Sequence, residues 1–261
     1  MGMRALPLVL MAGLTAAAQV ENPRFDVVSV RPAAPGARIG NLMQGGPGTA
    51  DPSRFTGTNV MLSTILLNAF GIRSDQLNAP DWISSPDLRF DIAATVPAGA
   101  TKDQLGTMLQ NMLIDRFHLA YHRARKEFPV YMLTVAPNGP KLKPAVPQTR
   151  PMPGMRIMAS CEGDRMTVNG RDAAGIAQAL QSAVGARVVD KTGLTGTYDI
   201  ELYFGVDRSR GGGPMNCTGK SLDAPPVFEA VQKQLGLKLE KGSAMFDVIV
   251  IEHLDEMPVE N

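Results

Sequence analysis

The sequence lacks a surplus of charge of either sign, and beyond its first residues it lacks a long apolar run. Its 26 lysines and arginines against 25 aspartates and glutamates give a formal net charge of +1. A chain without an overall basic field does not gather phosphate backbones or anionic lipid, so we expect no nucleic-acid partner. No later segment is apolar for long enough to form a membrane helix, so we expect no membrane span in the mature chain. A composition of 44% hydrophobic and 20% charged residues excludes a disordered or collagen-like protein.

Residues 1–18 have the three-part layout of a secretory signal. One positive charge, Arg4, precedes an apolar stretch over residues 5–14, and three alanines at 16–18 follow. The apolar stretch is too short to cross a bilayer as a permanent helix. We therefore predict a signal peptide over 1–18 and an exported protein, periplasmic or extracellular, of bacterial origin. A buried N-terminal helix is the alternative.

Cysteine is scarce, since Cys161 and Cys217 are the only two in the chain. An oxidising compartment outside the cytoplasm permits them to pair. We predict a disulfide between Cys161 and Cys217, with two separate free thiols as the alternative.

The residues that carry most catalysis and metal binding are also few. His118 and His122 lie four apart in a predicted strand, which places them about 13 Å apart along the chain, too far to share a metal unless the segment is helical. The HExxH arrangement and the Gly-x-Ser-x-Gly motif are absent, and neither cysteine has a neighbouring histidine. We therefore expect no metal and no cofactor and assign no catalytic residue. A triad assembled from distant residues stays open.

The two halves of the chain share a pattern that indicates an internal duplication. An arginine, an apolar residue and a threonine open each copy, and a helical stripe follows that ends at Gly71 in the first and Gly185 in the second. The next strand of each copy has an aromatic-Asp-Ile core, around Asp91 and Asp199. A second helix follows, at 101–116 and 226–235. Chance similarity of two α+β halves is the alternative.

Each copy is predicted to end in a pair of strands, 118–128 with 130–135 and 237–240 with 246–251. The sequence therefore predicts an α+β protein made of two similar βαβαββ units, each a small sheet with its helices on one face. We place the first unit at 19–136, with an extra strand near its start, and the second at 161–261. Residues 137–160 between them are rich in proline, which is typical of a linker.

Several segments resemble the soil-associated protein family, a family of secreted proteins of unknown function that is expanded in Acidobacteria. The resemblance rests on FDVVSVRP at 25–32, DRFHL at 115–119, FPVY at 128–131, NGPKLKP at 138–144 and above all VVDKTGLTGTYD at 188–199. It implies no established activity, and it implies that the same domain occurs appended to membrane zinc peptidases of the beta-lactam-sensor type. The repeated unit is also similar to the small N-terminal domains of secretins and TonB-dependent receptors, which implies an interaction module.

The Asp190-Lys191-Thr192 segment is the candidate site that this motif offers. Its likeness to the aspartyl-phosphate motif of P-type ATPases fails, because Leu194 stands where that motif continues with threonine and no membrane helices follow. One interpretation is structural, with Asp190 accepting hydrogen bonds from the amides of a tight turn. The other keeps Asp190, Lys191 and Thr192 as exposed polar groups that bind a partner.

Helices on one face of a small sheet leave an edge strand open, and a partner strand added to such an edge is a common mode of recognition. We therefore expect a non-catalytic module that binds a protein or an envelope polymer. The alternatives are a secreted hydrolase acting on envelope or extracellular polymer, and a ligand-sensing module.

Overall fold

The computed structural model describes residues 22–34, 42–146, 154–205 and 224–259, in which helices and strands mix as expected for an α+β protein. Its elements before residue 140 are β1 (Val27–Pro32), β2 (Leu42–Gly45), β3 (Arg54–Met61), α1 (Leu62–Phe70), η1 (Ser74–Gln76), β4 (Leu77–Asn78), η2 (Asp81–Ser84), β5 (Arg89–Thr95), α2 (Lys102–Phe117) and β6 (Ala120–Val135). The later elements are β7 (Lys143–Pro144), β8 (Met155–Ala159), β9 (Asp164–Arg171), α3 (Ala173–Val184), β10 (Val188–Asp190), β11 (Tyr198–Phe204), α4 (Val227–Ala230), η3 (Val231–Leu235) and β12 (Leu237–His253).

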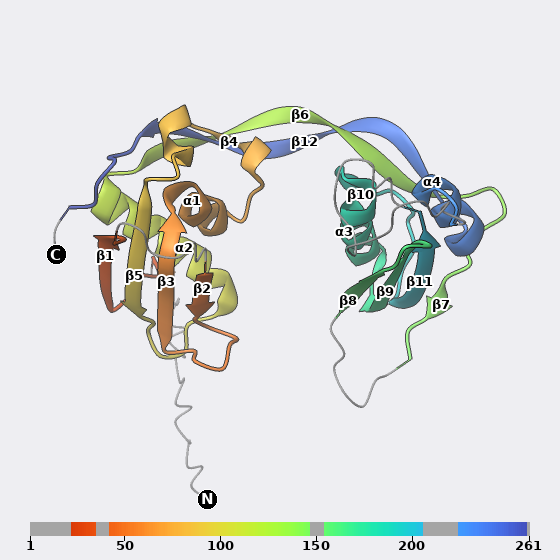
Figure 1. Ribbon diagram of the computed structural model, residues 1–261, viewed down its shortest axis with the longest axis horizontal. Coiled ribbons are helices and arrows are strands. Elements are labelled where there is room, and N and C mark those ends of the chain that lie inside the picture. The colour runs from red at the N-terminus through yellow and green to blue at the C-terminus, as the bar shows by residue number, and fades with distance from the viewer. Residues whose placement is uncertain (1–21, 35–41, 147–153, 206–223, 260–261) are drawn as a thin grey trace, which may run out of the picture. The chain divides into compact units, whose positions relative to one another are not determined.

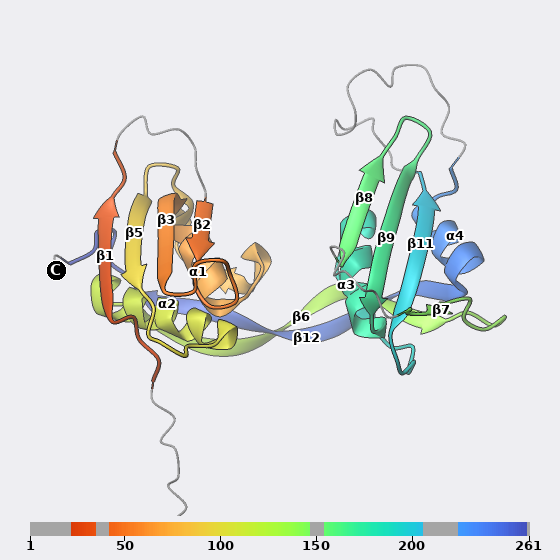
Figure 2. The same cartoon turned by 90° about the horizontal axis from the view of Figure 1, so that it is seen from below.

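The strands form three four-stranded sheets. Two of them, ordered β1-β5-β3-β2 and β7-β11-β9-β8, are antiparallel throughout (Figure 2). The third has the order β10-β6-β12-β4, and its outer strands β10 and β4 pair in parallel with β6 and β12.

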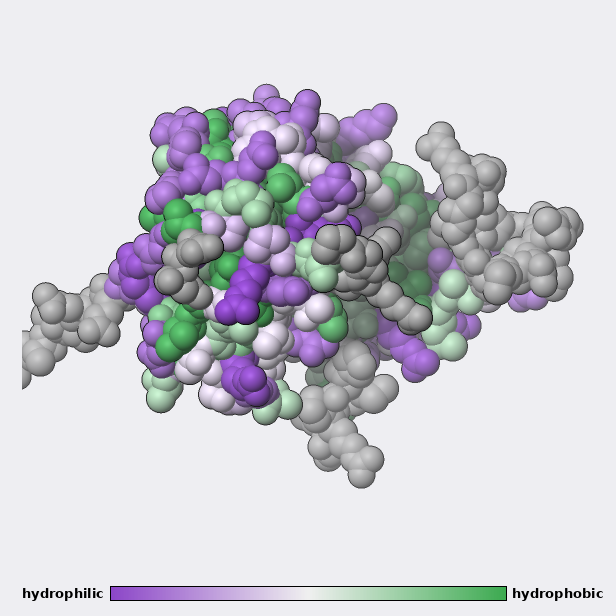
Figure 3. Space-filling model, turned by 60° about the vertical axis from the view of Figure 1, so that its left-hand side comes forward, coloured by the Kyte–Doolittle hydropathy of each residue, from purple (hydrophilic) through white to green (hydrophobic). Residues whose placement is uncertain are grey.

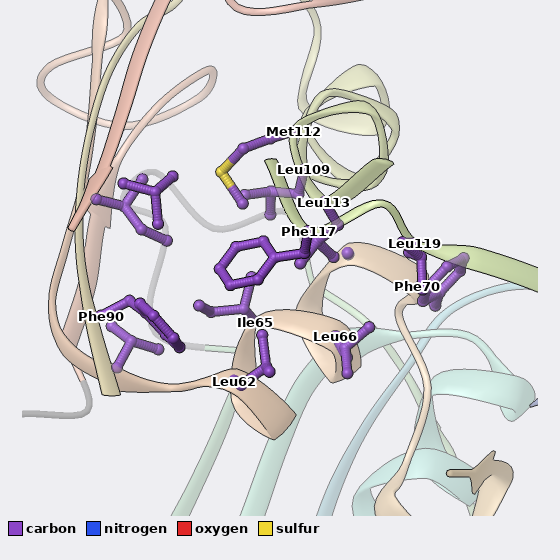
Figure 4. Close-up of a cluster of buried hydrophobic side chains, with 14 of the residues drawn as sticks. Leu62, Ile65, Leu66, Phe70, Phe90, Leu109, Met112, Leu113, Phe117 and Leu119 are labelled. Atoms are coloured by element: carbon purple, nitrogen blue, oxygen red, sulfur yellow. The ribbon is translucent and has the colours of Figure 1, made fainter. Parts of the chain in front are cut away.

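The first unit packs α1 and α2 on one face of the β1-β5-β3-β2 sheet (Figure 1). In α1 the residues Leu62, Ile65, Leu66 and Ala69 are buried, which is the spacing of one helix face. They meet Phe90 of β5 and Phe117 of α2 in the core shown in Figure 4. The helix ends at Gly71, whose φ of 61° is left-handed, so the predicted helix and its stop are confirmed.

The second unit has a comparable helix in α3, which also has a side-chain cap. The Asp172 carboxylate caps its first turn by accepting a hydrogen bond from the Gly175 amide at 2.8 Å. Ile176, Ala177 and Leu180 are buried, and the predicted stop at Gly185 is confirmed by its φ of 70°. The predicted helix at 226–235 is also present, as α4 followed by the π-helical turn η3, and it ends at Gly236.

The last strands differ from the predicted pairs. Residues 120–135 form the single strand β6 and residues 237–253 the single strand β12, and these two strands are hydrogen-bonded neighbours. Each copy therefore ends in one long strand and not in a hairpin. The physical reason is the pairing between distant segments, because β6 and β12 pair with each other and each also pairs with a further strand, β10 or β4.

The compact units also differ from the predicted segments 19–136 and 161–261. The first comprises Met1–Ala124 with Asp247–Asn261, and the second Arg125–Phe246. The side chains of Ile249, Ile251 and Leu254, at the end of the chain, are buried in the core that contains α1 and α2. Leu133 of β6 is buried in the core that contains α3. Each long strand thus follows a helix of one unit and ends in the core of the other.

The proline-rich segment predicted as a linker at 137–160 has structure where it is described. Lys143 and Pro144 form β7, which pairs with Asp199 and Tyr198 of β11. Met155–Ala159 form β8, which pairs with β9. Proline is tolerated in β7 because the strand lies at the edge of its sheet.

Large hydrophobic side chains also occur on the surface. In Figure 3 one face of the molecule is mostly hydrophilic, with hydrophobic residues in scattered groups. No helix in the described part of the chain combines the length and the apolar character that crossing a membrane requires.

Candidate functional site at the edge of β11

A cavity of about 430 Å³ lies beside β11 in the second unit, and we call it the β11 notch. Its size is within the range of small-ligand pockets. It is bounded by the chain at 141–143, by β9 and β11, and by the end of η3. The residues that line it are Lys141, Leu142, Lys143, Arg165, Thr167, Asn169, Asp199, Ile200, Glu201, Tyr203, Gln234 and Leu235.

Most of the polar lining comes from the sheet face that bears no helix. Met166 and Val168 of β9 and Leu202 of β11 are buried on the other face, against α3 and η3. Because side chains alternate along a strand, Thr167, Glu201 and Tyr203 point away from this core. The polar residues of the notch are therefore the outward-facing side chains of strands whose other side chains face the core.

The notch exists because β7 is short. β7 covers only Tyr198 and Asp199 of β11, whereas β1 in the first unit covers all of β5 from Phe90 to Thr95. The chain before β7 turns away to the end of η3, where the Lys141 amide donates to the Leu235 carbonyl at 2.8 Å. This approach needs glycine at 236, since a Cβ there would lie 2.2 Å from the Gly139 carbonyl oxygen.

The exposed edge of β11 is only partly satisfied by hydrogen bonds. The Ala145 amide donates to the Thr197 carbonyl, so the odd-numbered residues of β11 direct their backbone groups to this edge. At Tyr203 the Gln234 side chain completes the pairing: its Oε1 accepts from the Tyr203 amide at 2.9 Å, and its Nε2 donates to the Tyr203 carbonyl at 2.7 Å. At Glu201, between these positions, the backbone N–H and C=O face the notch.

The charges around the notch do not cancel. The Asp199 carboxylate accepts hydrogen bonds from the Gly170 amide at 2.7 Å and from the Val146 amide at 3.2 Å, so its oxygens are engaged. Arg165 and Glu201 form an ion pair with each other. With Lys141 and Lys143 the lining carries three cations, Arg165 included, against the two carboxylates, so one positive charge is in excess. The ammonium of Lys141 donates to the Lys233 carbonyl at 2.9 Å, and within the described residues that of Lys143 has no carboxylate partner.

Asp199 has a counterpart in the first unit, which identifies its role. Asp91 occupies the same place in the other aromatic-Asp-Ile motif, and its carboxylate accepts from the Asn59 amide at 2.8 Å. Asn59 and Gly170 both have positive φ, 52° and 61°, and both lie where the pairing register of their strand shifts. Each aspartate therefore holds an irregular residue of the neighbouring strand.

The predicted candidate residues Asp190, Lys191 and Thr192 lie outside the notch. The Thr192 amide donates to Asp190 Oδ1 at 2.9 Å and its hydroxyl donates to the same oxygen at 2.8 Å. The Lys191 amide donates to the Leu133 carbonyl at 2.8 Å. The interpretation of Asp190 as the acceptor of a tight turn is confirmed, while a binding role for these residues stays a prediction.

The cysteines and histidines considered in the sequence analysis do not assemble into a catalytic cluster among the described residues. Cys161 lies in the turn between β8 and β9, but Cys217 lies outside the described residues, so their disulfide stays a prediction. His118 and His253 both contact the Asp255 carboxylate, at 2.6 and 3.1 Å, and His122 contacts Glu252. Hydrogen bonding from His118 lowers the pKa of Asp255. Within the described residues, no cluster of histidine, cysteine, aspartate or glutamate side chains is arranged to hold a metal ion.

Two further cavities lie in the first unit, beside the chain that leads into β1. They share Arg24, Phe25, Asp26 and Met108, and the ion pair between Arg24 and Asp115 borders one of them. Unlike the β11 notch, they lie next to an edge strand that already covers its neighbour completely.

Comparison with known proteins gives a family without an assigned activity. The model of the family described as "Protein of unknown function (DUF3738)" matches residues 63–254, more than half of the chain. The chain belongs to this family. No curated protein and no solved structure matches the chain. The match covers the β11 notch, all of α1 but its first residue, and every later element through the end of β12.

The sequence shows the notch residues without revealing their role. Lys141 and Lys143 belong to the NGPKLKP segment, whose prolines indicate a linker. The repeated aspartates at 91 and 199 stand out as a motif, but nothing local marks them as hydrogen-bond acceptors. The sequence signal that points to the notch is the presence of both motifs, 138–144 and 188–199, in one chain. In the structure the two motifs meet at this edge, because Lys143 pairs with Asp199.

Proposed function

We propose that this protein is an exported, non-catalytic binding module that acts on a protein or an envelope polymer in the periplasm or outside the cell. The observation that carries the proposal is the interrupted edge of β11. A sheet edge with backbone donors and acceptors facing an open notch is suited to receive an extended chain. The surrounding polar side chains and the ammonium groups of Lys141 and Lys143 supply contacts that select the ligand.

We also propose that the two units arose by duplication of one βαβαβ element. Two observations support this. The antiparallel sheets have corresponding orders, with β3, β5 and their flanking strands in one and β9, β11 and theirs in the other. The helices α2 and η3 both end in a left-handed residue, His118 and Gly236. In this view the β11 notch is the place where the second copy lacks most of the edge strand that β1 provides in the first.

A sensing role is the second candidate, supported by the resemblance to a secreted family whose domain is appended to membrane zinc peptidases. Sensing needs the same binding event and differs only in the signal that binding would trigger. Enzymatic turnover of envelope polymer is the outcome that would replace both.

The test fills the notch with a large side chain. Thr167 lines the notch, and its counterpart Thr56 lies at the corresponding register position of the first unit, opposite Ala93 as Thr167 is opposite Glu201. Purified protein, T167W and the matched control T56W are incubated with fractionated bacterial envelope proteins and polymers. We expect T167W to lose binding by about tenfold or more, a difference of about 1.4 kcal/mol, and T56W to keep it.

The same incubations are assayed for new reducing ends and new amino termini. Turnover of the bound material by the unmodified protein would overturn the non-catalytic assignment. Equal binding by all three proteins would remove the notch from the binding site. Melting temperatures of both variants establish that each is folded.

A further inference from the structure

We propose that the β11 notch binds an acidic peptide segment in extended conformation, added to β11 as a strand that continues β7. This inference rests on the proposed binding function and names its ligand class. It combines a position of the β11 edge that no described strand covers with two ammonium groups in a notch lined by three cationic and two anionic side chains.

The backbone argument comes from comparing the two units. In the first unit Ser29 of β1 is paired with Ala93, which stands two residues after Asp91. Glu201 stands two residues after Asp199, and at this position the described part of the second unit provides no paired strand on the β7 side. A peptide residue placed opposite Glu201 would take the place that Ser29 has opposite Ala93. Its N–H and C=O would pair with the backbone groups of Glu201.

The flanking positions limit the length of the added strand. On one side β7 begins at Lys143, opposite Asp199. On the other side Gln234 occupies the backbone groups of Tyr203. The gap itself is thus centred on one residue, and a longer peptide must displace the Gln234 side chain. A cavity of about 430 Å³ is consistent with a short segment.

The direction of the strand determines where its charge is needed. β7 runs antiparallel to β11, and a peptide that continues β7 in the same direction ends beside Lys143. The C-terminal part of the peptide therefore meets the ammonium of Lys143, with Lys141 lining the same notch. Glu201 is paired with Arg165, whereas the Asp199 carboxylate keeps its charge, so an acidic ligand gains attraction from the net positive charge that the two lysines give the notch.

A neutral polysaccharide fits these observations less well. The main-chain groups of Glu201 offer one donor and one acceptor at strand spacing, which a peptide matches with its own backbone. A polymer without acidic groups forms no ion pair with Lys141 or Lys143. Binding of such a polymer at the notch is one outcome of the experiment and would contradict the inference.

The experiment measures the affinity of the full protein for three fluorescent peptides by anisotropy. Each is a blocked hexapeptide of alternating threonine and valine, with two aspartates at its C-terminal end, with two aspartates at its N-terminal end, or with two asparagines at its C-terminal end. We expect the first to bind most tightly. We expect each of K141Q and K143Q to weaken it by about two- to fivefold, since exposed charge pairs contribute little singly.

The controls separate charge at the notch from charge elsewhere. K102Q removes an exposed lysine of α2 in the first unit, and K191Q removes the lysine of the predicted Asp190–Thr192 site; both should bind the first peptide normally. K143E should reverse the preference toward a peptide with two lysines in place of the aspartates. Hydrogen exchange should show slower exchange of the Glu201 amide when the first peptide is bound, because that amide becomes paired.

Equal affinity for all three peptides, or no effect of K141Q and K143Q, would overturn the acidic-peptide assignment even if T167W abolishes capture of envelope material. A loss caused by K191Q and not by K143Q would move the site to the 190–192 turn. If no peptide binds while a polysaccharide fraction still binds and T167W prevents it, this inference fails and the proposed function stands. If the protein binds none of the peptides and none of the envelope material, the proposed function fails as well.

Discussion

At the scale of single residues, the two repeated aspartates accept hydrogen bonds from backbone amides. Asp199 holds the Gly170 and Val146 amides, and Asp91 holds the Asn59 amide. A short carboxylate side chain can reach an irregular amide in the neighbouring strand, which a longer glutamate would overshoot. The residue with positive φ differs between the units, because asparagine and glycine both tolerate left-handed backbone.

This role predicts unequal costs for removing the two carboxylates. Replacing Asp199 with alanine removes two hydrogen bonds from a carboxylate to backbone amides, and replacing Asp91 removes one. We expect D199A to lower the free energy of unfolding by about 2–3 kcal/mol and D91A by about 1–1.5 kcal/mol. Urea denaturation of both variants measures this. A larger loss for D91A, or none for D199A, would contradict the assignment.

A second prediction at this scale concerns acid pH. The His118 hydrogen bond lowers the pKa of Asp255 in the folded protein below its ordinary 3.8. A carboxyl whose folded pKa is depressed stabilises the fold above its unfolded pKa, and this stability is lost as the pH falls through the folded value. The unmodified protein should therefore be more stable than D255N at about pH 6, and the difference should shrink below about pH 4.

Urea midpoints of the two proteins between about pH 3 and pH 7 check this. E256Q, which changes the neighbouring exposed carboxyl, is the control. A difference between the unmodified protein and D255N that grows as the pH falls would mean that the ionised carboxyl does not stabilise the fold.

At the scale of elements, the helices are predictable because their signals are local. The stripe at Leu62, Ile65, Leu66 and Ala69, the stop at Gly71 and the reciprocal Thr101–Gln104 capping pair each lie within one helix. The strands at the repeated aspartates are predictable for the same reason. β7 is not, because Lys143 and Pro144 become a strand only through pairing with β11, a partner about fifty residues away in sequence.

The candidate site escapes prediction for a related reason. A notch formed where a two-residue strand ends is not marked by any particular type of residue. Its main feature is the backbone N–H and C=O of Glu201. The side chains around it look like ordinary solvated residues of a polar sheet face. Only the pairing register, which depends on contacts between distant segments, shows that β11 is covered at Asp199 and open at Glu201.

At the scale of the whole molecule, the long strands β6 and β12 decide which residues stabilise which unit. The sequence predicts hairpins within each copy, because nothing local distinguishes a strand that folds back from one that continues. The strand pairing distinguishes them: Ile249 of β12 pairs with Leu77 of β4, and Tyr131 of β6 pairs with Val188 of β10. Residues at the end of the sequence therefore belong to the first core.

This assignment gives a prediction that contrasts with the predicted segment 161–261. Ile249 is fully buried in the first core and Leu133 in the second. Trp82, the only tryptophan, packs against the first core and reports on it. We expect I249A to cost about 2–4 kcal/mol and to shift the unfolding transition seen by Trp82 fluorescence. L133A should cost a similar amount and shift mainly the transition of the second unit.

Hydrogen exchange locates the second effect, with faster exchange expected in α3 for L133A and in α1 and α2 for I249A. V248A, at a buried residue of β12 whose side chain points to the opposite face from Ile249 and is not part of the first core, is the control, for which a smaller shift is expected. If I249A instead loosened α3 and left the Trp82 transition unchanged, the end of the chain would belong to the second unit, as the sequence alone indicates. If L133A and I249A moved the Trp82 transition equally, β6 and β12 would stabilise both cores as one cooperative unit, and the separate assignment of Ile249 and Leu133 would be wrong.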